Sequence, residues 1–183
     1  MNENVTWRAH PHCPRPHACW SAPDDQGAEH EVTRFVASLV RLTKPESVIE
    51  TGTHLGVTTA AIAAALRRNG FGHATSFEID AARAANAERA LAHYASVLTI
   101  VPSECVSGNL PSVIDFAFLD SSMGARAREM RLVWPRLSPG GLVLVHDASP
   151  QRPPGRVRPP EPFAFFEFAT PRGLNAFQKP WAS

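Results

Sequence analysis

The chain has 183 residues, of which 44% are hydrophobic and 19% are charged. This length suits one domain with a substantial core, and the composition is that of a folded protein rather than a disordered one. The formal net charge of +1 gives no basis for binding nucleic acid or an anionic membrane surface. Because there is no long apolar run and there are only three cysteines, we expect a cytoplasmic protein without a disulfide framework.

Two segments differ from the rest of the chain in composition. Residues 1–27 contain clustered histidine, cysteine and proline, and residues 150–162 contain six prolines and three arginines. Proline removes a backbone donor and disfavours a helix before it, so both segments are expected to be irregular. We therefore expect an irregular N-terminal arm over 1–27 and a single domain over 28–183.

Most of this domain alternates between strand and helix patterns. Short apolar runs without polar alternation are typical of parallel strands that helices cover on both faces. The runs between them have helical periodicity or are rich in alanine, and Asp80 is a candidate N-cap. The pattern predicts helices over 29–42, 57–68, 80–94 and from the fourth strand to about 137, and strands over 47–50, 73–78, 97–101, 115–119 and 141–146.

The last part of the domain follows a different rule. Two runs typical of strands, 163–169 and 174–178, are separated only by the turn residues 170–173. A connection this short requires an antiparallel hairpin. The sequence thus predicts an α/β fold with a doubly wound, mostly parallel seven-stranded sheet and a C-terminal antiparallel hairpin.

Polar residues follow each predicted parallel strand, at the edge where open α/β sheets bind ligands. After the first strand, Gly52 and Gly56 permit a sharp turn and close approach of a ligand to the backbone. After the second, Glu78 could accept both hydroxyl hydrogens of a ribose. The remaining strand ends carry Ser103, Asp120, His146 and Asp147. Each feature alone also fits a plain turn, a solvated residue or a helix cap, but their occurrence at five successive strand ends favours a ligand site.

Five segments carry a family resemblance: VIETGTHLGVTT, SFEID, DFAFLDSS, LSPGGLVLVHDAS and FATPRGLNAFQ. Over about residues 29–179 the chain resembles class I S-adenosylmethionine-dependent methyltransferases, specifically the small O-methyltransferase-like branch. The resemblance implies a Rossmann-like methyltransferase fold, S-adenosylmethionine as the cofactor, and a small-molecule acceptor that is methylated on a hydroxyl.

The resemblance also assigns residues to the cofactor. Glu78 would hold the ribose, Ile79 would pack on the adenine, and Ser103 would lie near the adenine edge. Asp120 would face the cofactor's amino group, the acceptor or a metal, and the loop after the first strand would surround the methionine end. The cofactor-binding residues implied are Glu50, Thr51, Gly52, Thr53, Gly56, Thr58, Glu78, Ile79, Ser103 and Asp120.

Methylation of a hydroxyl requires a general base or a metal that makes the acceptor nucleophilic. The catalytic candidates are His146, Asp147 and Asp120, and we favour His146 as a base oriented by Asp147. His54 is an alternative base, and His146 could instead be a buried histidine with a structural hydrogen bond. Magnesium held by Asp120 and Asp147 is the other possibility, but Ala148 and His146 replace the oxygen donors that it prefers.

Other functions fit the sequence less well. A dinucleotide-dependent dehydrogenase would need a third glycine in the first loop. A non-catalytic sensor or scaffold that binds S-adenosylmethionine would not need the acidic and histidine residues at the last two strand ends. A homodimer is compatible with the sequence. We expect Arg152, Arg156 and Arg158 to border the acceptor site.

The N-terminal arm carries a cluster of metal-ligand residue types. A zinc site there is conceivable, although paired CxxC or HxxxH spacing is missing. We favour an arm that covers the acceptor and excludes water. The residues concerned are His10, His12, Cys13, His17 and Cys19.

Overall fold

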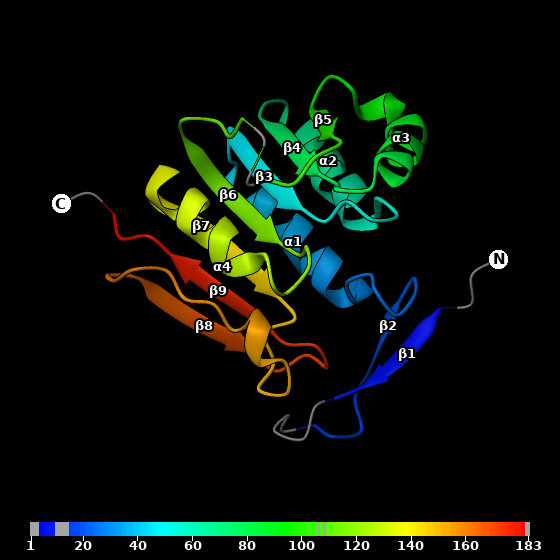
Figure 1. Ribbon diagram of the computed structural model, residues 1–183, viewed down its shortest axis with the longest axis vertical. Helices are drawn as coiled ribbons and strands as arrows, with labels where there is room; N and C mark the ends of the chain where they lie inside the picture. The colour runs from blue at the N-terminus through cyan, green and yellow to red at the C-terminus, as the bar shows by residue number, and fades with distance from the viewer. Residues whose placement is uncertain (1–3, 10–14, 106, 108, 182–183) are drawn as a thin grey trace.

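The computed structural model describes residues 4–9, 15–105, 107 and 109–181. Its main element is a seven-stranded sheet with the strand order β5-β4-β3-β6-β7-β9-β8 (Figure 1). The strands from β5 to β7 are parallel, and β9 pairs antiparallel with both β7 and β8. These strands are β3 (Ser47–Thr51), β4 (His73–Phe77), β5 (Leu98–Val101), β6 (Ile114–Leu119), β7 (Leu137–His146), β8 (Ala164–Phe168) and β9 (Leu174–Gln178).

Helices cover both faces of the sheet. On the face covered by α1 and α2, Phe116 and Phe118 of β6 are fully buried. On the opposite face, Ala117 and Leu119 of the same strand pack with residues of α4. Within the described residues no helix is long and apolar enough to cross a membrane. The helices are α1 (His30–Thr43), α2 (Val57–Asn69), α3 (Ala81–Ala90) and α4 (Arg126–Val133), with the 3-10 turns η1 (Ala92–Tyr94), η2 (Trp134–Arg136) and η3 (Pro153–Gly155).

The predicted doubly wound sheet with its C-terminal hairpin is confirmed. From β3 the chain builds outwards through β4 to β5, and then returns to add β6 and β7 on the other side of β3. Asp80 is the N-cap of α3 as predicted, because its side chain accepts hydrogen bonds from the amides of Ala82 and Arg83. The order of the strands reverses between β3 and β6, which is where open α/β sheets bind ligands.

Several boundaries differ from their predicted places, including the two on either side of η2. β7 begins at Leu137 rather than at Gly141, and its pairing with β6 contains an irregularity in register. The α-helical part before it ends at Val133 and continues only as η2, in which Pro135 lacks the amide that an α-helix would need. The strand therefore begins at the residue where the helix was predicted to end.

The N-terminal arm is not irregular as predicted. β1 (Val5–Arg8) and β2 (Cys19–Ala22) form an antiparallel hairpin beside the main sheet, in which Trp7 lies opposite Trp20 (Figure 1). β-branched and aromatic residues favour these strands, whereas Pro16 lies between them and Pro23 directly follows β2. Three residues of the conceivable zinc site, His10, His12 and Cys13, lie outside the described residues.

Candidate active site

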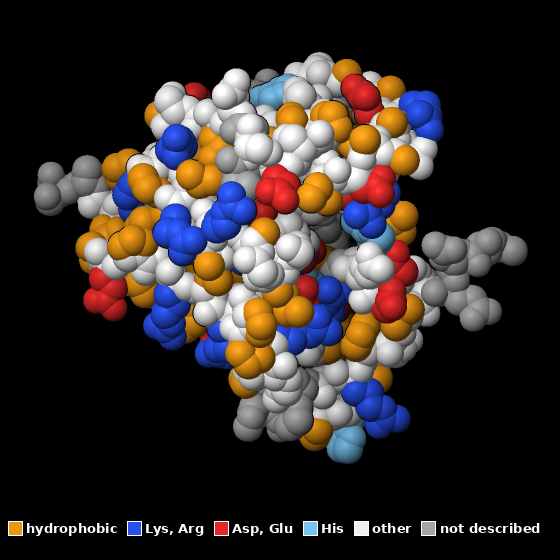
Figure 2. Space-filling view, in the orientation of Figure 1, with side chains coloured by type: hydrophobic (Ala, Val, Ile, Leu, Met, Phe, Trp, Pro, Cys, Tyr) orange, Lys and Arg blue, Asp and Glu red, His pale blue; other side chains and the backbone are white. Residues whose placement is uncertain are grey.

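A cavity of about 510 Å³ opens at the carboxyl ends of β3, β4, β6 and β7, at the reversal in strand order. Figure 2 shows a hollow near the middle of one face, with acidic and basic side chains on its walls. The segment before α1, the loops after these strands and the turn of the C-terminal hairpin contribute to its lining. The predicted site residues that line it are Gly52, Thr53, Thr58, Glu78, Ile79, Asp120 and Asp147.

The loop after β3 packs closely against the loop after β6. Gly52 has a φ of 85°, and a Cβ atom at this position would collide with the backbone carbonyl of Asp120. Its amide donates to the carbonyl of Phe77 at the end of β4. A residue without a side chain is therefore required where the ends of three neighbouring strands meet.

Some predicted cofactor residues support this loop from behind rather than lining the cavity. Glu50 is 1% exposed and accepts hydrogen bonds from the hydroxyls of Thr59, at 2.5 Å, and Ser76, at 2.6 Å. Burial raises the pKa of Glu50 to about 7. Thr51 donates to buried Glu129, and Gly56 is the N-cap of α2. Ser103 is also absent from the described cavity wall.

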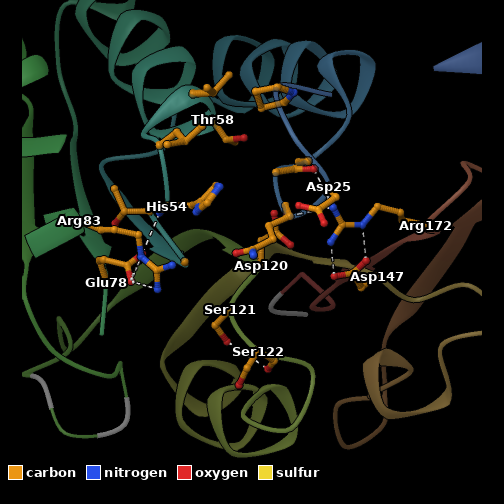
Figure 3. A pocket seen from close by; sticks show the side chains of 18 of the residues that line it. Asp25, His54, Thr58, Glu78, Arg83, Asp120, Ser121, Ser122, Asp147 and Arg172 are labelled. Atoms are coloured by element: carbon orange, nitrogen blue, oxygen red, sulfur yellow. Dashed lines mark hydrogen bonds and ion pairs between the residues drawn. The ribbon is translucent and has the colours of Figure 1, made fainter. Parts of the chain in front are cut away.

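On the other side of the cavity, Glu78 connects the loop after β3 to the start of α3. Its carboxylate accepts hydrogen bonds from the amide of His54 at 2.8 Å, the amide of Asp80 at 3.0 Å and Nε of Arg83 at 3.2 Å. Beside it, the apolar side chain of Ile79 is 65% exposed. Figure 3 shows Glu78 and His54 on one side of the cavity, and Asp147 and Arg172 on the other.

His146 is not placed to act as a base. Its ring is fully buried, with Nδ1 at 2.8 Å from Asp120 and Nε2 at 2.5 Å from Glu29. Burial alone would lower the pKa of His146, but the charges and hydrogen bonds of these two carboxylates raise it to about 9. An imidazolium bonded at both nitrogens has no lone pair for a proton. This corrects the predicted His146–Asp147 base, and the geometry fits the structural alternative.

Asp147 is held by arginines rather than by His146. Arg172 forms a two-point contact, with Nε at 2.6 Å from Oδ1 and Nη2 at 2.8 Å from Oδ2. Arg152 adds a bond of 2.9 Å and Arg126 one of 3.3 Å. Although burial raises the pKa of Asp147, the hydrogen bond from Arg172 and the surrounding positive charges hold it well below its usual value. The Asp147 carboxylate is therefore a weak base.

The same arginines occupy the carboxylates that a metal ion would need. Asp120, His146 and Asp147 each offer a donor atom within 4.8 Å of the others. However, Nη2 of the fully buried Arg126 lies 3.2 Å from Asp120 and 3.3 Å from Asp147, so a guanidinium spans the two carboxylates that would share the metal. A protonated His146 is not a ligand, and magnesium needs several oxygen donors. The residues present do not fit a divalent metal, because arginine supplies the positive charge.

We expect the free energy of unfolding to fall as the pH rises from 6.5 to about 9. The folded state raises the pKa of His146 from 6.5 to about 9, so this stabilisation is complete below pH 6.5 and is lost as the pH passes through 9. Urea denaturation across this range measures the change. His146→Gln is the control, because it cannot titrate and should show a smaller dependence, whereas Glu50 titrates in both proteins. Equal dependences would contradict the expectation.

Four contributors to the site were missed by the sequence interpretation. Glu29 and Asp24 precede α1, Arg126 begins α4, and Arg172 lies in the hairpin turn. Arg172 also donates to the carbonyls of Gln26 and Gly27, which ties the turn to the segment before α1. A charged residue in the tight turn 170–173 was the available signal for Arg172. Arg126 bonds to Asp120, six residues away, but the other partners lie far along the chain and nothing in the local sequence indicates them.

Comparisons with known proteins agree with this architecture. The family described as a methyltransferase domain matches residues 49–148. No curated protein matches the chain significantly. The O-methyltransferase TomG of Streptomyces achromogenes, solved with SAM, has a TM-score of 0.68 at 16% identity, over 85% of this chain and 82% of that chain. An O-methyltransferase of Bacillus cereus solved with SAH has a TM-score of 0.67 at 13% identity, over 85% of this chain and 84% of that chain. The SAH-bound methyltransferase PaMTH1 of Podospora anserina has a TM-score of 0.73 at 14% identity, over 87% of this chain and 81% of that chain.

At these identities, the likeness to solved structures shows the fold. The family match covers more than half of the chain and runs from β3 to the end of β7. It therefore includes the strand ends that carry Gly52, Glu78, Asp120 and Asp147. The chain belongs to the methyltransferase-domain family.

Proposed function

We propose that the protein binds S-adenosylmethionine in the cavity and transfers its methyl group to a hydroxyl group of a small molecule. Membership of the family supports methyl transfer. The names of TomG and of the Bacillus cereus protein support oxygen as the acceptor atom. A cavity of about 510 Å³ is of the size that small ligands occupy.

The observation that carries the proposal is the position of Glu78. Its carboxylate lies in the cavity wall at the end of β4, beside the glycine-containing loop after β3. Its three bonds to His54, Asp80 and Arg83 fix the orientation of the carboxylate. Two of these bonds fall on Oε1 and one on Oε2, so Oε2 keeps an acceptor site for a ribose hydroxyl.

The neighbouring residues fit the rest of the cofactor. Ile79 offers an exposed apolar surface for the adenine, and Gly52 and Thr53 offer a close backbone approach for the methionine end. Asp120 provides a negative charge for the amino group. When bound, the cofactor supplies a methyl group on a positively charged sulfur that is a good leaving group.

The remaining wall suits the acceptor. Pro23 and Asp25 come from the segment before α1, Met123 from the loop after β6, and Arg152 from the arginine- and proline-rich loop. The other two arginines of that loop turn elsewhere: Arg156 pairs with Glu167, and Arg158 lies over the ring of Phe165. Of the three arginines expected to border the acceptor, only Arg152 lines the described cavity wall.

Glu78→Ala is expected to weaken binding of S-adenosylhomocysteine at least tenfold. Removing a charge-assisted hydrogen-bond acceptor costs about 1.5–3 kcal/mol. Isothermal titration calorimetry of the wild type and the variant measures the loss. Because Arg83 also loses its partner, Glu78→Gln serves as a second variant that keeps the size of the side chain.

The matched control is Glu88→Ala, which removes an exposed carboxylate of α3. It should bind as the wild type does. A wild-type protein that binds neither S-adenosylmethionine nor its demethylated product would contradict the proposed function. Equal affinities for the Glu78 variants and the wild type would contradict the assignment of Glu78.

A further inference from the structure

His54 occupies an unusual backbone position in the wall of the cavity. It lies between Gly52 and Gly56 with a φ of 48°, in the left-handed region that residues with side chains seldom adopt. Among the described residues other than glycine, only Lys44, at the end of α1, and Asp147, in the same cavity, share this property. A left-handed residue at a ligand site is a mark of function, because the surrounding structure must hold it there.

The ring of His54 is oriented by a carboxylate. Its Nε2 lies 2.7 Å from Oδ2 of Asp24, in the segment before α1. A carboxylate can only accept a hydrogen bond here, so Nε2 carries the hydrogen and Nδ1 of the neutral ring keeps its lone pair. Nδ1 has no hydrogen bond to any residue that the structure describes. Figure 3 shows the ring projecting into the cavity between Glu78 and Asp120.

The other proton acceptors on the described wall are already engaged or weak. Glu78 accepts three hydrogen bonds, Asp120 is bonded to a guanidinium and an imidazolium, and Asp147 is held by arginines. Asp25 is an exposed carboxylate, and carboxylates are weaker bases than imidazole. With a free lone pair on Nδ1, the imidazole of His54 is the group on this wall best suited to take a proton.

We propose that His54 is the general base for the acceptor hydroxyl and that Asp24 positions it, an inference that rests on the proposed function. The O–H bond of the acceptor breaks and its proton moves to Nδ1 of His54. The electron pair left on oxygen forms the bond to the methyl carbon, and the pair of the sulfur–carbon bond stays on sulfur. The resulting imidazolium is stabilised by Asp24 and returns its proton to solvent through the partly exposed edge of the ring, since the side chain is 23% exposed.

Asp24 is arranged to hold the ring without taking part in the reaction. Its Oδ1 accepts hydrogen bonds from the amides of Gln26, at 3.0 Å, and Gly27, at 2.6 Å, which leaves Oδ2 for His54. Asp24→Asn can keep this turn through its amide oxygen, but it turns an NH2 donor towards Nε2, so the hydrogen of the ring moves to Nδ1. We expect it to lower kcat nearly as much as the loss of His54 does and to leave binding of S-adenosylhomocysteine unchanged.

The first test reads the proton directly, without turnover. 4-Nitrophenol is added to the protein with S-adenosylhomocysteine bound, at a pH below the ionisation of free 4-nitrophenol. With the wild type the yellow phenolate band should grow on binding, because the phenolic proton moves to Nδ1 of His54. With His54→Gln, 4-nitrophenol should remain the colourless phenol. The same colour with both proteins would overturn the proposal.

The second test is methylation of a panel of phenols and alcohols in the presence of a chelator. His54→Gln should lower kcat about 10²–10⁴-fold, while calorimetry shows unchanged binding of S-adenosylhomocysteine. His73→Gln is the matched control, because His73 is bonded to Thr99 and starts β4 at the opposite end of the strand. A wild-type enzyme that methylates hydroxyls equally well without His54 overturns this inference alone. Absence of cofactor binding or hydroxyl methylation in the wild type overturns the proposed function on which it rests.

Discussion

Asp147→Asn is expected to lower the free energy of unfolding by about 3–5 kcal/mol. The side chains of Asp147, Arg126 and Arg172 are 7%, 0% and 6% exposed, so the variant leaves buried guanidinium groups without their counter-charge. Asparagine is the right replacement, because it has nearly the same shape and tolerates the φ of 57° at this position. Urea denaturation of the variant and the wild type at neutral pH measures the loss.

An exposed ion pair provides the comparison for this loss. Arg156 and Glu167 lie 3.0 Å apart, but their side chains are 31% and 35% exposed. Glu167→Gln should therefore cost at most about 1 kcal/mol. If the two variants lost the same stability, the buried network would contribute no more than a surface pair, and the argument for arginine in place of a metal would fail with it.

Gly52→Ala is expected to cost about 2–5 kcal/mol of stability and to weaken binding of S-adenosylhomocysteine. A left-handed conformation costs alanine about 1–2 kcal/mol, and forcing a methyl group against the carbonyl of Asp120 costs about 1–3 kcal/mol more. Relief of the contact must separate the loop after β3 from the loop after β6, both of which line the cavity. Denaturation and calorimetry report the two effects.

Gly70→Ala separates the two causes. Gly70 has a φ of 84°, almost the same as that of Gly52, but a Cβ atom there meets nothing within 4 Å. It should cost only the conformational part, about 1–2 kcal/mol, and leave cofactor binding unchanged. Equal losses of stability in the two variants would show that the close approach of the two loops does not contribute to the cost of Gly52→Ala.

The sequence predicted what depends on neighbours along the chain. The strands and helices followed from local periodicity, and Gly52, Glu78 and Asp120 reached the cavity because they directly follow parallel strands of one sheet. The roles of charged groups were not predictable in this way. His146 ends β7 as expected, yet it is enclosed by Glu29, which is 117 residues away in the chain.

The prediction of an irregular N-terminal arm was wrong for a related reason. Its composition is dominated by prolines and histidines, and these concealed two short strands in which Trp7 lies opposite Trp20. This segment also concealed the partner of the proposed base. His54 was visible as a candidate in the first loop, but its partner Asp24 belongs to a segment that the sequence assigned to an irregular arm.

The contacts of Arg172 impose an order on the assembly of the protein. The strands β3, β4 and β5 and their helices are close along the chain and can pair early, because short loops are cheap to close. Arg172 reaches back to Gln26 across 146 residues and to Gly27 across 145. During synthesis, the ribosome must therefore release most of the chain before the acceptor wall can close, so the half of the site assigned to the nucleoside forms first and the half assigned to the acceptor forms last.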